Sequence, residues 1–122
     1  MPTTKIITNI VNAFVSNNAA IVHMQLNMPA VALSYLNKAK TLLAKACTGV
    51  EDKDLHLLSL NYGSYIDSIA YNQAVALLKI KPKESYSYFE VVRKSSQMSR
   101  SYKFWYRMAQ SVLQYYHTPK LQ

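Results

Sequence analysis

The chain has little of what disulfide frameworks, flexible linkers and phosphate-binding loops require. Its 122 residues include one cysteine, two glycines and four prolines. A single cysteine, Cys47, excludes an internal disulfide and makes a reducing compartment the default. With only Gly49 and Gly63 present, a glycine-rich phosphate-binding loop is excluded. The scarcity of helix-breaking residues favours helices joined by short turns.

Long apolar runs are also missing. No stretch approaches the roughly 18 apolar residues needed to cross a bilayer, and the first ten residues lack the pattern of a signal peptide. We therefore expect no membrane contact. The hydrophobic fraction of 50% is nevertheless too high for a disordered chain and is sufficient for a packed core.

Acidic residues are scarce, at 6 against 14 lysines and arginines, which gives a net charge of +8. The bases gather between Lys79 and Arg107, whereas four acids lie between Glu51 and Asp67. Such a balance suits an acidic partner or a nucleic-acid backbone, or it is only the uneven charge of a scaffold. We favour the last interpretation, because the basic and aromatic residues fall first on positions that pack helices together.

Residues that carry catalysis do not form a recognisable set. His23, His56 and His117 are scattered, and no pair has the spacing of metal ligands. No serine lies in the sequence context of a nucleophile. We expect no metal, no cofactor and no enzymatic activity.

Against these absences stands a repeated spacing of small residues. In residues 17–43, Ala20 is followed at 12, 16 and 19 residues by Ala32, Leu36 and Ala39. This spacing is typical of the tetratricopeptide repeat, in which two antiparallel helices meet through small side chains.

Two further copies of the spacing follow. In residues 71–92, Ala74 is followed at 11, 15 and 18 residues by Ser85, Phe89 and Val92. In residues 104–116 only a first helix is present, and Ala109 stands 35 residues after Ala74, close to the repeat period of about 34. Trp105 takes the tryptophan position of this copy, and we expect it to wedge against the preceding helices.

The spacing predicts an all-α fold, a tetratricopeptide-like superhelix of about two and a half repeats with a short inserted helix. The whole chain, 1–122, is expected to be one domain. The predicted parts are a first hairpin at 4–47, an irregular connection at 48–67, a second hairpin at 68–96 and a last helix at 101–116. The connection should hold a short helix at 54–61, whose leucines pack on the first hairpin, and a turn through Gly63.

Polar residues and prolines suggest the helix ends. Thr3 or Thr4 could cap the first helix, and Asp67 or Ser68 the helix after the connection. Asn27 is expected to end the first helix. Pro29 and Pro82 each suit the first turn of the next helix.

In such repeats the first helix of each pair lines a concave surface, which supplies the predicted binding site. Tyrosine, methionine and arginine, which protein interfaces favour, occur on it, and an apolar groove suits a helix or an extended segment of a partner. The predicted groove residues are Phe14, Asn17, Ile21, Met24, Tyr71, Asn72, Val75, Leu78, Lys79, Lys103, Tyr106, Arg107, Gln110 and Leu113.

Three of these residues suggest a more specific ligand. Asn72, Lys103 and Arg107 occupy positions at which some co-chaperone repeats clamp a peptide's terminal carboxylate, a ligand that suits charged hydrogen bonds. The clamp is incomplete, because Ile21 stands where a donor is needed.

Several stretches resemble the tetratricopeptide subunit ten of the CCR–NOT mRNA deadenylase complex. They are VSNNAAIVHMQLNMPAVALSYLNKAKTLL, LHLLSLNYGS and IAYNQAVALLKIKPKESYSYFEVVRKSSQMSRSYKFWYRMAQSVLQYY, within about residues 14–116. The matching residues are Asn17, Asn18, His23, Tyr71, Asn72, Leu77, Leu78, Pro82, Phe89, Trp105, Arg107 and Ala109. The chain departs from the pattern in lacking a glycine before Lys81 and in its short middle segment.

The resemblance implies a non-catalytic scaffold that binds subunit eleven and the large scaffold subunit of that complex. It implies a role in poly(A) shortening, mRNA decay and RNA-mediated silencing, in the cytoplasm and also the nucleus. Two alternatives stay open: a basic helical-repeat module that binds RNA, and a co-chaperone-like receptor for an acidic peptide C-terminus.

Overall fold

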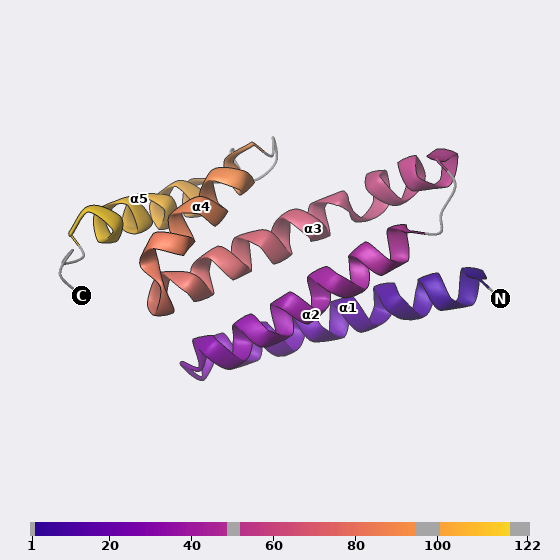
Figure 1. The fold of residues 1–122 in the computed structure, drawn as a ribbon, viewed down its shortest axis with the longest axis horizontal. Coiled ribbons are helices and arrows are strands. Elements are labelled where there is room, and N and C mark those ends of the chain that lie inside the picture. Colours follow the sequence, from indigo (N-terminus) through magenta and orange to yellow (C-terminus); the bar gives the residue numbers. More distant parts are fainter. Residues whose placement is uncertain (1, 49–51, 95–100, 118–122) are drawn as a thin grey trace.

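A computed structural model describes residues 2–48, 52–94 and 101–117 of the chain. All the secondary structure in these ranges is helical, which confirms the all-α prediction. The helices are α1 (Pro2–Gln25), α2 (Pro29–Cys47), α3 (Asp52–Ile80), α4 (Pro82–Arg93) and α5 (Tyr102–His117). Each helix packs on the next along the chain, and α3 contacts all four others. In Figure 1, α3 lies between the α1–α2 pair and the α4–α5 pair.

The two tight turns follow the sequence signals. Asn27 has a φ of 58°, in the left-handed region that asparagine tolerates better than most residues. Pro29 then stands in the first turn of α2, and Pro82 in the first turn of α4. The predicted roles of Asn27, Pro29 and Pro82 are confirmed.

The predicted connection between the hairpins is wrong. A single 29-residue helix, α3, runs from Asp52 through Gly63 to Ile80, so neither a separate helix at 54–61 nor a turn at Gly63 exists. One glycine costs a helix interior only about 1 kcal/mol, which packing elsewhere along the helix can offset. The predicted packing of Leu55, Leu57, Leu58 and Leu60 lies outside the described side chains.

The predicted side-chain caps are wrong for the same kind of reason. Asp67 and Ser68 lie inside α3, and Thr3 and Thr4 lie inside α1. The α1 helix begins at Pro2. A proline suits a first turn because its missing N–H would have no partner there.

The first core joins the α1–α2 hairpin to one side of α3. Its closest contacts are made by small side chains, since Ala20, Ala32 and Ala39 are all fully buried. Small residues at these positions let the helix axes approach closely. Leu36 of α2 and Ile69 of α3 fill the space beside them. The burial of Ala20, Ala32 and Ala39 agrees with the predicted spacing.

The second core joins α3, α4 and α5 through aromatic rings. Phe89 of α4 and Phe104 of α5 are fully buried, with ring centroids 6.0 Å apart. The Ser85 hydroxyl donates a hydrogen bond of 2.8 Å to the carbonyl of Ala74. This bond holds α4 against α3 where the predicted small residues meet.

The predicted role of Trp105 is wrong. Its side chain is 47% exposed, and Ala109 is also exposed. Phe104, Met108 and Ser111 instead face the preceding helices. The packed face of α5 therefore lies one residue earlier than predicted, which is a rotation of about 100° around the helix axis.

Candidate functional site

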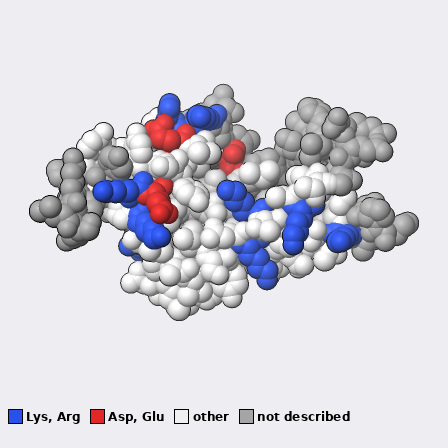
Figure 2. Space-filling model, in the orientation of Figure 1, with Lys and Arg blue, Asp and Glu red and all other residues white. Residues whose placement is uncertain are grey.

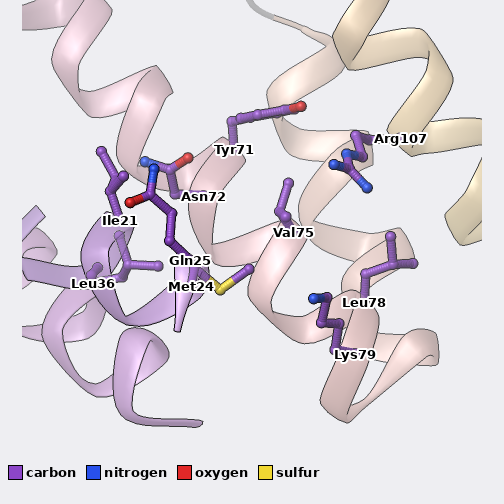
Figure 3. Close-up of a pocket in the computed structure, with 11 residues that line it drawn as sticks. Ile21, Met24, Gln25, Leu36, Tyr71, Asn72, Val75, Leu78, Lys79 and Arg107 are labelled. Atoms are coloured by element: carbon purple, nitrogen blue, oxygen red, sulfur yellow. The ribbon is translucent and has the colours of Figure 1, made fainter. Parts of the chain in front are cut away.

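A hollow of about 330 Å³ opens between α1, α3 and α5 and is drawn in Figure 3. We call it the α1–α3–α5 hollow. Its lining residues are Ala20, Ile21, Met24, Gln25, Leu36, Tyr71, Asn72, Val75, Leu78, Lys79 and Arg107. Those from α3 recur at helical spacing, so one face of that helix forms a wall.

The structure brings eight of the fourteen predicted groove residues together in this hollow. They are Ile21, Met24, Tyr71, Asn72, Val75, Leu78, Lys79 and Arg107. Sequence reasoning missed Ala20, Gln25 and Leu36, the first and last because they had been assigned to the core. Binding of a partner by any of these residues stays a prediction.

The other six predicted residues do not line the hollow. Phe14 packs on Tyr65, with ring centroids 4.0 Å apart, and Asn17 is buried. Gln110 accepts a hydrogen bond from Arg107. Lys103, Tyr106 and Leu113 are exposed on α5. The incomplete clamp therefore separates, because Arg107 and Asn72 line the hollow and Lys103 does not.

Amide side chains fix α3 against the first hairpin beside the hollow. Asn72 Nδ2 donates to Asn17 Oδ1 at 3.1 Å. Gln73 Nε2, on the other side of α3, donates to Asn37 Oδ1 at 2.8 Å. Buried amides that pair in this way set the register of packed helices, because a shift would leave them without partners. The two walls of the hollow are thus held in a defined relation.

Arg107 and Lys79 supply the charge of the hollow, and their hydrogen-bond partners there are neutral. Arg107 Nη1 donates to Gln110 Oε1 at 3.1 Å, and its guanidinium carbon lies 6.0 Å from the centre of the Tyr106 ring. Lys79 Nζ donates to Asn27 Oδ1 at 3.4 Å. Among the residues that the structure describes, no acidic side chain lines the hollow.

Tyr71 forms the edge of the hollow nearest to Arg107. In Figure 3 its hydroxyl end points toward α5, the helix that carries Arg107. Burial raises the pKa of Tyr71, and the nearby Arg107 guanidinium opposes this only in part. Tyr71 is therefore neutral at pH 7 and leaves the charge of Arg107 uncompensated.

The acids that the structure describes elsewhere are already placed with bases or on the opposite side of α3. On α4, Glu84 lies 3.7 Å from Lys81 and Glu90 lies 3.1 Å from Arg93. Figure 2 shows lysines and arginines spread over one face of the molecule, with acids in only a few places. The positive charge at the hollow belongs to this wider excess of basic side chains.

A second hollow of about 490 Å³ lies between α2, α3 and α4, and nothing in the sequence pointed to it. We call it the α2–α3–α4 hollow. Its lining is mainly apolar, with one basic and one acidic side chain, Lys40 and Asp67. Cys47 also lines it and is half-buried.

Other features that chemistry could use have structural explanations here. His23 Nδ1 lies 2.7 Å from the carbonyl oxygen of Ala19, and its ring stacks on Tyr35 at 5.1 Å. In the described ranges, no three His, Cys, Asp or Glu side chains gather as metal ligands would. Over the same ranges, no helix combines the length and apolar character needed to cross a membrane.

Comparison with known proteins found no matching family model, no similar curated protein and no similar solved structure. The functional argument therefore depends on the geometry of the hollows and on the residues of the chain itself.

Proposed function

We propose that this chain is a non-catalytic scaffold of tetratricopeptide-like repeats that binds a segment of a partner polypeptide in the α1–α3–α5 hollow. The observation that carries the proposal is the lining of that hollow. It combines apolar side chains, an aromatic ring and two cations, a composition favoured by protein interfaces. Its walls belong to packed helices, so little ordering is needed on binding.

The repeat assignment is supported by the contacts inside both hairpins. Ala20 and Ala32 are fully buried in the first, and Ala74 and Ser85 in the second. In each pair, small side chains from consecutive helices stand at the spacing that the repeat requires. The exposed Ala109 is the position at which the third copy departs from this pattern.

The resemblance to subunit ten of the CCR–NOT complex extends the proposal to a cellular role. The partners would be subunit eleven and the large scaffold subunit, and the process would be poly(A) shortening in the cytoplasm, with a further role in the nucleus. In this role the chain positions other subunits and carries out no bond-making step.

The direct test is affinity purification of the tagged protein from cells, with identification of the proteins that co-purify. Ile21→Glu places a carboxylate in the hollow at a side chain that is 40% exposed. We expect this variant to retain its helicity by circular dichroism and to lose most of the co-purified subunits.

Val15→Glu is the matched control, because Val15 lies on the same helix, is 60% exposed and does not line the hollow. It should capture the same proteins as the unmodified chain. Equal capture by the two variants would place the interface elsewhere. Tyr71 is a poorer choice for substitution, because its ring packs edge-on against Phe89 at 6.0 Å.

RNA binding is the second candidate, favoured by the net charge of +8 and by the spread of basic side chains in Figure 2. A poly(A) oligonucleotide titrated at several salt concentrations tests it. Binding through phosphates should weaken steeply as salt rises. Absence of binding at low salt would remove this candidate.

A further inference from the structure

We propose that the α1–α3–α5 hollow recognises an internal acidic residue, Asp or Glu, that lies beside an apolar residue in the partner segment. The carboxylate would pair with Arg107, and the apolar side chain would cover Met24, Val75 and Leu78. This inference rests on the proposed function, and it adds the chemistry by which the partner is selected.

The first argument is the charge state of Arg107. A guanidinium has five N–H donors, and in this structure Nη1 is directed to the neutral Gln110. The side chain is half-buried, so its charge is only partly hydrated. A carboxylate that accepts two of the remaining donors would compensate the charge with the strongest geometry available to arginine.

The second argument is the positioning of that guanidinium. Gln110 lies one turn further along α5 and holds Nη1 at 3.1 Å, while the Tyr106 ring lies beside the guanidinium. Tyr71, whose ring is packed against Phe89 and Phe104, borders it on the α3 side. A donor already oriented by its neighbours loses little conformational entropy on binding.

The third argument is the separation of charge from apolar surface within the hollow. In Figure 3, Arg107 and Lys79 lie on the side of α3 and α5, whereas α1 contributes Ile21, Met24 and the uncharged Gln25. Met24 extends from α1 toward Val75 across the floor. A ligand that fills the hollow needs one acidic side and one apolar side.

This division favours a polypeptide over RNA and an internal residue over a chain end. A phosphate backbone would pair with the cations but leave the apolar floor of Met24 and Val75 uncovered. A terminal carboxylate requires several converging donors. Here Lys103 lies outside the hollow, and Ile21 cannot donate.

The test begins with selection of random peptides of about 12 residues displayed on phage, with the 122-residue chain immobilised. We expect Asp or Glu close to Leu, Ile, Phe or Met in the enriched sequences. The best peptide is synthesised with an amidated C-terminus, and its affinity is measured by fluorescence polarisation. Replacing its acid by the matching amide should weaken binding about tenfold, the usual size of a charge-assisted hydrogen bond.

A double-mutant cycle assigns that loss to one pair of groups. Arg107→Gln should weaken the unmodified peptide about tenfold and should leave the amide form of the peptide almost unaffected. Lys103→Gln, an exposed cation on the same helix outside the hollow, is the control and should change affinity by less than about twofold.

The outcomes separate this inference from the proposed function. Peptides that lose binding on Ile21→Glu but show no preference for acids overturn the acid recognition and leave the scaffold function standing. Selected peptides that are all insensitive to Ile21→Glu, or a failure to enrich any peptide, count against both. Loss of binding on amidation, or displacement of the peptide by poly(A) RNA, would replace the internal acid by a chain end or by a nucleic acid.

Discussion

The two helical hairpins of this molecule are closed in different ways. In the first, helices of 24 and 19 residues meet along a row of buried alanines that includes Ala20, Ala32 and Ala39. In the second, α4 has only 12 residues and buries Ser85, Phe89 and Val92 against α3. The first hairpin relies on close approach over a long contact, and the second on a hydrogen bond and large rings.

The difference shows how a short helix can be stabilised by the element that follows it. Phe89 reaches zero exposure beside Phe104, which α5 contributes from outside the hairpin. Stability in helical arrays is shared between a repeat and its neighbour. Here the sharing is unequal, because the second hairpin needs α5 more than the first hairpin needs either.

The largest effect should come from Phe104→Ala, which removes the ring that covers Phe89. Truncation of a buried phenylalanine costs about 3–5 kcal/mol of the free energy of unfolding. Urea denaturation measures the loss, and native-state hydrogen exchange locates it. We expect α4 and α5 to lose protection while α1 and α2 keep most of theirs. Equal loss of protection in all helices would show that the hairpins unfold as one unit.

Trp105→Ala is the control for that variant. Trp105 is the neighbouring aromatic residue on the same helix, but it lies on the exposed side. Its removal should cost clearly less than the removal of Phe104.

The next effect should come from Ala32→Leu in the first hairpin. A larger side chain at this fully buried position forces α1 and α2 apart, at a cost of about 1–3 kcal/mol. Ala30→Leu, on the exposed side of the same helix, should leave the midpoint of urea denaturation almost unchanged. Similar midpoints for the two variants would contradict closure by small residues.

A smaller effect is expected from Ser85→Ala, which removes the hydrogen bond to the Ala74 carbonyl. The loss should be about 1 kcal/mol, the typical net contribution of one such bond. Ser87→Ala, exposed two residues later, serves as the matched variant. If Ser85→Ala proves neutral, ring packing alone holds the second hairpin together.

The smallest effect is a dependence on alkaline pH that belongs to the second hairpin. Because burial raises the pKa of Tyr71, the folded state holds this proton more tightly than the unfolded chain, whose tyrosines titrate near about 10. The contribution to stability is complete below that value and is lost as the pH rises through the folded-state pKa. Thermal unfolding followed by circular dichroism should show Tm falling above pH 10, and falling less steeply in Tyr71→Phe. Parallel curves would remove Tyr71 as a cause.

Residue spacing predicted the parts of the fold that depend on local geometry. Ala20, Ala32 and Ala39 announced a close helix pair, and the prolines announced the starts of α2 and α4. The α3 wall of the α1–α3–α5 hollow followed from the same periodicity, since Tyr71, Val75 and Leu78 share a helix face.

What the sequence could not decide depends on contacts between distant segments. Phe104 and Trp105 are adjacent aromatic residues, and only the packing of α5 on α4 selects the first. Gly63 permits either a turn or a continuous helix, so the choice rests on the packing of the helix around it. The α2–α3–α4 hollow forms between three helices that each look ordinary in sequence.

The participation of α3 in both cores restricts how the length of this chain can vary. Ile69 and Ala76 of α3 belong to the first core, and Ala74 belongs to the second. One residue inserted between Ile69 and Ala74 would rotate the rest of the helix by about 100° and remove these side chains from one core or the other. Insertions in related sequences should therefore collect between α2 and α3 or between α4 and α5, and should avoid the middle of the shared helix.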